Sequence, residues 1–142
     1  MIQTHLFPRT QIDITLHIVQ VDGGLLSACI NATTLALVHA GIPMVDMITA
    51  CTVGYLDSNC ILDLNHQEEN AGAPELTLVL VPKTSDILSV TMGSNATRVN
   101  TKLMEELLRQ ANIGCQKISK ILQSSAREYI GASMKEMSIS GT

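Results

Sequence analysis

The chain has 142 residues, 46% of them hydrophobic, which is the size and apolar content of one globular domain and argues against intrinsic disorder. A formal net charge of −4 and few aromatic residues exclude a basic, base-stacking surface, so we expect the chain alone to bind nucleic acid weakly. Its apolar stretches are too short and too often interrupted to span a membrane, and the first ten residues lack the pattern of a secretory signal.

The first predicted elements are a strand and a helix joined by a glycine turn. Apolar and polar residues alternate from Thr10 to Gln20, the period of a strand with one buried face. Asp22-Gly23-Gly24 breaks that pattern, and apolar residues then recur at helical spacing from Leu25 to His39. Because these residues surround almost the whole helix, we expect it to be buried between other layers.

Two hairpins and a long helix follow. Met47 to Leu56 with Cys60 to Leu64 predicts the first hairpin, and Glu75 to Val81 with Ile87 to Met92 predicts the second. A stripe of apolar residues spaced three and four apart begins after Asn100, a good N-cap, and predicts a long amphipathic helix. The predicted fold is therefore of the α/β class, an α+β sandwich in which a mixed sheet carries a buried helix and a long C-terminal helix.

Two smaller predictions concern side chains. Glu105 and Arg109 are spaced for an i,i+4 ion pair on the solvent side of the long helix. The four cysteines have no CxxC spacing and each lies in an apolar segment, so we expect reduced thiols in the core.

Four segments resemble the RNase PH family in their order and spacing. They are Phe7–Asp13, Val21–Gly24, Ala40–Met44 and Ile61–Ala71, and the last two look most like exosome subunits of the ribosomal RNA-processing protein 41 type. The resemblance implies a ribosomal protein S5 domain 2-like fold. Residues 1–137 would form the second half of an RNase-PH-like domain, followed by a disordered tail at 138–142. Such a chain could be a short isoform, a fragment or an incomplete gene model.

The glycine turn is where the resemblance implies phosphate binding. In active members of the family this turn reads Asp, Gly, Gly, a small hydroxyl residue and Arg, and the helix that follows favours an anion at its start. Here Gly23 and Gly24 are kept, but Leu25 and Leu26 stand in place of the hydroxyl residue and the arginine. We therefore expect phosphate binding to be lost. The alternative is that both glycines only permit a strand-to-helix turn.

Asp63 and Glu69 match a pair of aspartates, six residues apart, that the resemblance implies for metal binding and acid–base chemistry in active relatives. Glu69 carries one extra methylene, and a displacement of about 1 Å in a reacting group can lower the rate roughly a hundredfold. The alternative is a solvated acidic rim formed by Asp63, Glu68 and Glu69. Arg9, next to a family motif, is the candidate RNA-binding residue.

No cofactor or metal site is expected. His66 lies beside the carboxylates, but no second His or Cys stands at ligand spacing. His17 and His39 fall in a predicted strand and a predicted helix, where a hydrogen-bonded structural histidine is commoner than a catalytic one.

These observations predict a noncatalytic, RNase-PH-like ring subunit of the RNA exosome that supports 3′-to-5′ RNA processing and degradation, including rRNA processing and mRNA decay. By the resemblance, its partners are other RNase-PH-like ring subunits, S1/KH cap subunits and RNA in the assembled pore, with no membrane. Its expected locations are the nucleus, nucleolus and cytoplasm. Two alternatives stay open. One is an active phosphate-dependent 3′-to-5′ exoribonuclease subunit whose partner supplies the arginines, and the other is a truncated form that does not assemble.

Overall fold

The computed structural model describes residues 1–93 and 99–140. One short 3-10 helix precedes three α-helices and four strands. In chain order these elements are η1 (Thr4–Leu6), α1 (Leu25–His39), β1 (Thr49–Leu56), β2 (Asn59–Leu62), α2 (His66–Asn70), β3 (Glu75–Val81), β4 (Asp86–Met92) and α3 (Thr101–Ser140).

The four strands form one sheet in the order β2-β1-β3-β4. Both predicted hairpins are present, because β1 pairs with β2 and β3 pairs with β4. β1 and β3 lie side by side at the centre, with Val53 opposite Leu76. The predicted fold class is confirmed, but every pairing is antiparallel, so the sheet is not mixed.

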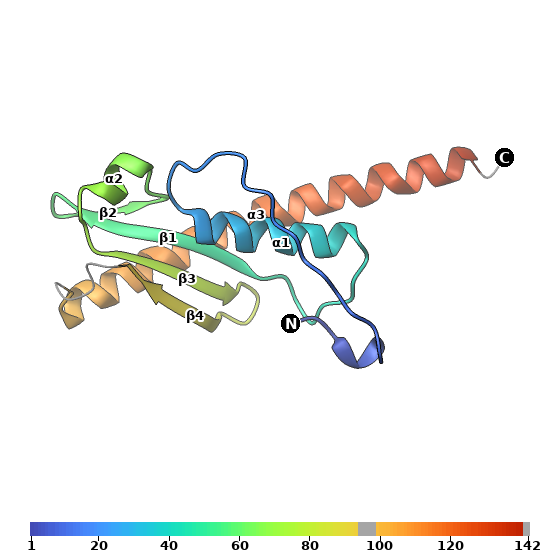
Figure 1. The fold of residues 1–142 in the computed structure, drawn as a ribbon, viewed down its shortest axis with the longest axis horizontal. Helices are drawn as coiled ribbons and strands as arrows, with labels where there is room; N and C mark the ends of the chain where they lie inside the picture. The colour runs from blue at the N-terminus through green and yellow to red at the C-terminus, as the bar shows by residue number, and fades with distance from the viewer. Residues whose placement is uncertain (94–98, 141–142) are drawn as a thin grey trace.

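The hydrophobic core lies between the sheet and α3, while α1 covers the opposite face of the sheet (Figure 1). Successive side chains of a strand point to opposite faces, so alternate residues of β1 and β3 all point toward α3. None of these core residues is more than 3% exposed. They are Cys51, Val53, Leu76, Leu78 and Leu80 from the sheet and Leu107, Ala111 and Cys115 from α3.

The strand predicted from Thr10 to Gln20 is not formed. These residues are an extended segment without a ladder partner, and the segment passes over α1 (Figure 1). Its apolar side chains stay exposed, by 49% at Ile14 and 56% at Ile18. Alternating apolar and polar residues are compatible with a strand. A strand forms only where a neighbouring strand exchanges backbone hydrogen bonds with it.

α1 has the predicted bounds but not the predicted burial. Its buried side chains are Ser27, Thr34 and Leu37, on the side that faces the sheet and α3. On its outer side Leu25 is 39% exposed, and Leu26, which lies beside Thr52 and Thr77 of the sheet, is 44% exposed. Residues 16–20 of the extended segment meet this outer side across an apolar hollow of about 400 Å³. The helix is therefore partly exposed on this side and is not buried between layers of the described residues.

α3 begins at the predicted N-cap and is the longest element. The side-chain oxygen of Asn100 accepts a hydrogen bond from the Leu103 amide at 2.9 Å. Forty residues make a helix about 60 Å long, and its C-terminal part extends past the sheet (Figure 1). Tyr129 stacks on His39 at the end of α1, with ring centroids 3.9 Å apart. Residues 138–140, predicted to be in the tail, are helical, and 141–142 lie outside the described residues.

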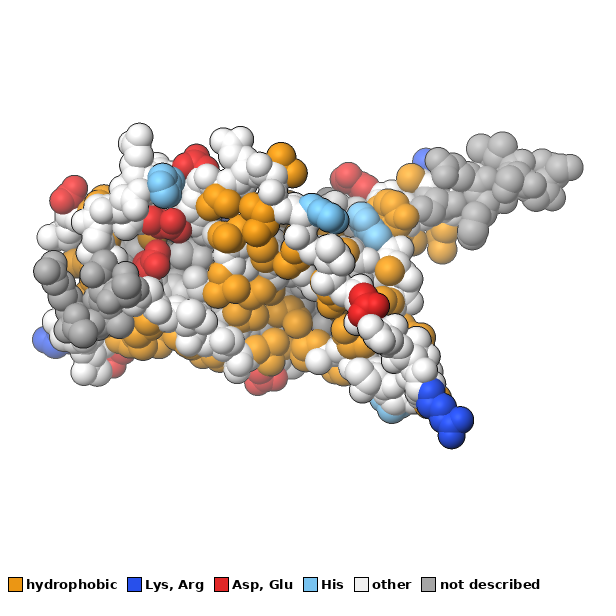
Figure 2. Space-filling model, in the orientation of Figure 1, with side chains coloured by type: hydrophobic (Ala, Val, Ile, Leu, Met, Phe, Trp, Pro, Cys, Tyr) orange, Lys and Arg blue, Asp and Glu red, His pale blue; other side chains and the backbone are white. Residues whose placement is uncertain are grey.

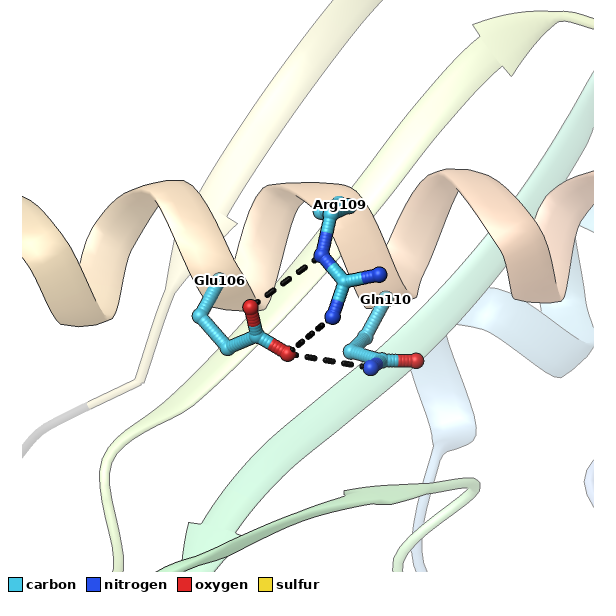
Figure 3. A network of polar contacts seen from close by, with 3 residues as sticks. All are labelled: Glu106, Arg109 and Gln110. Carbon is cyan, nitrogen blue, oxygen red and sulfur yellow. Dashed lines mark hydrogen bonds and ion pairs between the residues drawn. The ribbon is translucent and has the colours of Figure 1, made fainter.

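Arg109 pairs with Glu106 instead of the predicted Glu105 (Figure 3). The Arg109 side chain donates from Nη2 to Oε1 at 2.5 Å and from Nε to Oε2 at 3.1 Å. Gln110 donates to the same carboxylate at 3.0 Å. These hydrogen bonds lower the pKa of Glu106. The i,i+3 spacing wins because it lets the planar guanidinium contact both carboxylate oxygens.

The four cysteines are free, and Cys51 and Cys115 are buried in the core as predicted. Cys29 and Cys60 are only partly buried. Burial raises the pKa of Cys51 to about 11 and that of Cys115 to about 12, so both thiols are protonated at neutral pH. Within the described ranges, no helix is both long and apolar enough to cross a membrane.

Candidate functional site

The glycine turn before α1 requires a residue without a side chain. Gly23 and Gly24 have φ angles of +89° and +56°. A Cβ atom on Gly23 would lie 2.0 Å from the carbonyl oxygen of Leu64. A side chain here would therefore push the turn away from the residues that follow β2. Gly24 is the N-cap of α1, so the turn also sets where that helix starts.

The residues that follow β2, numbers 63–69, are called the acidic segment. Asp63 adopts a φ of +61°, and its amide donates to the Thr52 carbonyl at 2.9 Å. Asn65 then caps α2. Its side chain accepts from the Glu68 amide at 3.0 Å, and the Glu68 carboxylate accepts from the Asn65 amide at 2.9 Å. This capping box fixes the start of α2 and holds Glu69 in its first turn.

The glycine turn and the acidic segment form one site. The Gly24 amide donates to Oε1 of Glu69 at 2.8 Å, across 45 residues of sequence. The His66 amide donates to Oδ1 of Asp22 at 3.2 Å. A Cβ on Gly24 would lie 3.2 Å from Oδ1 of Asp63. The structure thus brings together the predicted phosphate turn and the predicted carboxylate pair, and acidic side chains gather over the α2 end of the molecule (Figure 2).

Glu69 occupies a position that suits an anion. The Gly24 amide stands at the beginning of a 15-residue helix, where unpaired N–H groups and the helix dipole favour negative charge. The side chain of Glu69 is long enough to reach this amide from α2. A phosphate group approaching the turn would compete with the Glu69 carboxylate for the same donor.

Beside this contact lies a hollow of about 210 Å³ bordered by Gly24, Leu25, Leu26, Glu69 and Glu75. Burial and the neighbouring Glu69 carboxylate raise the pKa of Glu75. The two leucines add apolar surface but no hydrogen-bond donor. None of the described residues that line this hollow is Lys or Arg. A phosphate bound here would need positive charge from outside this lining.

Asp63 also borders a second hollow, of about 350 Å³, between α1, β1 and α3. Asn31 of α1 lies in its wall and saturates the free edge of β1. Its side chain donates to the Ala50 carbonyl and accepts from the Ala50 amide, both at 2.9 Å. Asn31 is therefore structural, because it replaces the neighbouring strand that β1 lacks at this point.

The remaining predicted residues have different outcomes. Arg9 follows η1, the dark blue helix that lies at the opposite end of the molecule from α2 in Figure 1, so it is not part of this site. Glu68 caps α2. Asp22 and Asn65 contribute to the site but were not predicted, although the spacing of Asn65 and Glu68 is a readable capping-box signal. Within residues 1–93 and 99–140, no group of three or more His, Cys, Asp and Glu side chains is placed to hold a metal ion.

Two family models match the chain in succession. The model of domain 1 of the 3′ exoribonuclease family, RNase PH, matches residues 1–43, and the model of domain 2 matches residues 46–114. Together they include the glycine turn and the whole acidic segment.

Curated relatives and a solved structure agree with these matches. Exosome complex component RRP41 of Mus musculus is 40% identical over 129 residues, which are 91% of this chain and 51% of that protein. Exosome complex component Rrp41 of the archaeon Thermoplasma acidophilum is 34% identical over 126 residues, covering 81% of this chain and 51% of that protein. The crystal structure of rice (Oryza sativa) Rrp46 has a TM-score of 0.69 and 25% identity, and the match covers 77% of this chain and 51% of that chain. The chain spans about half the length of these relatives.

The comparisons correct one prediction. Both models describe a 3′ exoribonuclease family, and archaeal members at similar identity are named as exosome components. The prediction that the chain is not an enzyme is therefore wrong. It rested on Leu25 and Leu26, which remove a charge and a donor from one part of the site, and on the extra methylene of Glu69. The Gly24 amide, Asp63 and Glu69 remain together in the other part.

Proposed function

We propose that this chain, which belongs to the 3′ exoribonuclease (RNase PH) family, works as an exosome-type subunit in phosphate-dependent 3′-to-5′ processing and degradation of RNA. The observation that carries the proposal is the contact between Gly24 and Glu69, which joins the glycine turn to the acidic segment. Relatives named as exosome complex components, at about 40% identity over most of this chain, support the same assignment.

In phosphorolysis, an oxygen of inorganic phosphate forms a bond to the phosphorus of the last internucleotide linkage. The bond from that phosphorus to the 3′ oxygen of the preceding nucleotide breaks. The products are a nucleoside diphosphate and a shortened RNA whose 3′ oxygen has taken up a proton. A site for this reaction must hold phosphate, balance its charge and deliver that proton.

The residues of this chain meet part of these needs. The Gly24 amide and the start of α1 offer donors to the phosphate, provided that the Glu69 carboxylate gives way. Asp63, whose side chain lies beside Gly24, is the candidate group for proton transfer to the leaving 3′ oxygen. Leu26 supplies no cation, so the arginine that balances the phosphate charge comes from a neighbouring subunit.

An assembly also fits the exposed apolar residues of the extended segment and of α1, which this chain leaves uncovered. The proposed partners are other RNase-PH-like ring subunits and S1/KH cap subunits, with RNA threaded through the assembled pore. The proposed processes are rRNA processing and mRNA decay, in the nucleus, nucleolus and cytoplasm. The names of the eukaryotic relatives support the assembly.

The test is an assay of the full chain coexpressed with a neighbouring RNase-PH-type subunit, on single-stranded RNA radiolabelled throughout its length, with and without inorganic phosphate. We expect nucleoside diphosphates only when phosphate is present. Asp63→Asn should reduce their release by roughly 10²- to 10⁴-fold, the usual contribution of acid–base catalysis. The matched control is Asp57→Asn, which removes a carboxylate from the exposed β1–β2 turn and should leave the rate unchanged.

A gain-of-function variant sharpens this test. Leu26→Arg places a cation beside Glu69 at the glycine turn and should raise the phosphate-dependent rate. Nucleoside monophosphates released without phosphate, or an Asp63→Asn variant as active as the control, would contradict the proposed function.

A further inference from the structure

A separate polar cavity, of about 300 Å³, lies beside α3. Its other wall is formed by residues that precede β1 and by residues that follow β3. The side chains that matter for its chemistry are Asp46, Lys83, Gln116, Ser119, Lys120 and Gln123. None of the residues lining this cavity also lines either hollow of the candidate site. It is therefore a separate site, for which neither the family matches nor the mechanism above has a use.

Two amide groups in this cavity are oriented by hydrogen bonds. Nε2 of Gln116 donates to the Pro82 carbonyl at 2.9 Å, and Nε2 of Gln123 donates to the Ser119 hydroxyl at 3.1 Å. Each amide nitrogen carries two hydrogens, so each keeps one donor for a ligand. Ser119 is only 4% exposed and forms a rigid part of the wall. Each glutamine of the lining can therefore offer one N–H group to a ligand.

The charges of the cavity favour an anionic ligand. Lys83 and Lys120 come from different elements, and neither has an ion-pair partner in the part of the chain that the structure describes. Asp46 is the single carboxylate of the lining, and one of its oxygens already accepts from the Met47 amide at 2.8 Å. Two ammonium groups facing one cavity repel each other unless an anion lies between them.

We propose that this cavity binds a phosphate group, held by Lys83 and Lys120 and oriented by the amides of Gln116 and Gln123. Tetrahedral phosphate oxygens accept several hydrogen bonds at once, which matches donors that approach from α3 and from the loop after β3. Inorganic phosphate and the phosphodiester backbone of RNA share this chemistry. The inference does not depend on the proposed function, because it concerns binding by residues outside that site.

The test measures binding by the full chain in two arms, one with radiolabelled inorganic phosphate in equilibrium dialysis and one with fluorescent single-stranded RNA at several salt concentrations. We expect Lys83→Gln with Lys120→Gln to lower the affinity for phosphate at least tenfold. In the RNA arm, the slope of log affinity against log salt should decrease by roughly 0.7 for each phosphate contact that is lost. The matched control is Lys102→Gln, in the exposed first turn of α3.

A variant that is expected to raise the affinity controls for a nonspecific loss of binding. Asp46→Asn removes the only negative charge of the lining, keeps an oxygen for the Met47 amide and should tighten binding several-fold. An effect in the dialysis arm alone identifies free phosphate as the ligand, and an effect in the RNA arm identifies the phosphodiester backbone. If the double variant binds both ligands within twofold of the unmodified chain, or if Asp46→Asn weakens binding, the inference is wrong. Loss of RNA cleavage in Asp63→Asn has no bearing on this result, so the two proposals fail separately.

Discussion

The two faces of the sheet differ in how completely this chain covers them. On one face, Leu107, Ala111 and Cys115 of α3 are fully buried against β1 and β3. On the other, α1 covers β1, but its outer side and the extended segment keep apolar side chains in contact with solvent, and an apolar patch is visible across the middle of Figure 2. The first face is fully buried in the hydrophobic core. The second keeps an apolar surface that no layer of the described residues covers.

The largest expected difference between the faces comes from shortening one apolar side chain on each. Leu107→Ala removes a fully buried leucine and should lower the free energy of unfolding by about 2–5 kcal/mol. Ile18→Ala changes a side chain that is 56% exposed and should cost no more than about 0.5 kcal/mol. Urea unfolding of both variants measures the two effects. Similar midpoints would show that the extended segment is packed in solution and would remove the contrast.

Substitution of two glycines of α3 by alanine should have smaller effects on stability, and the two effects should be opposite in sign. A Cβ on Gly114 would lie 2.5 Å from Sγ of Cys51 in the core, so Gly114→Ala should destabilise the fold by about 1–3 kcal/mol. A Cβ on Gly131 would meet nothing within 4 Å, so Gly131→Ala should stabilise it by about 0.5–1 kcal/mol through helix propensity. Thermal unfolding gives both signs.

The cause of the Gly114 effect can be checked separately. Cys51→Ala removes the sulfur that the new methyl group would meet, so Gly114→Ala should cost less in that background than in the unmodified chain. Equal costs in the two backgrounds would mean that the crowding lies elsewhere.

Local patterns in the sequence predicted much of this fold. α1 and β3 have the predicted bounds, and the Asn100 cap begins α3 as its residue type indicates. The prediction of a strand from Thr10 to Gln20 was wrong. Alternation describes what one segment can do, whereas pairing needs a second segment that the same window does not contain. The predicted burial of α1 was wrong for the same reason. Apolar residues all round a helix do not show whether another layer covers it.

The candidate site was predicted in its parts but not in its contacts. The resemblance to the RNase PH family, which the family matches confirm, pointed to the glycine turn, Asp63 and Glu69. The hydrogen bond from Gly24 to Glu69 joins residues 45 positions apart, and no local pattern reports such a contact. The same holds for the cavity of Lys83 and Lys120, which are separated by β4 and half of α3 and are brought together only by the fold.

The central claim of this account is that the glycine turn and the acidic segment form one site, in which Glu69 occupies the anion position at Gly24. Nuclear magnetic resonance of the ¹⁵N-labelled chain tests it through the Gly24 amide. Because this amide donates to a carboxylate, its proton resonance should move as that carboxyl group is titrated, and Glu69→Gln should abolish the movement. Inorganic phosphate should then shift the Gly24 resonance more in Glu69→Gln than in the unmodified chain. A Gly24 resonance that follows no carboxyl titration and responds equally to phosphate in both chains would contradict the claim.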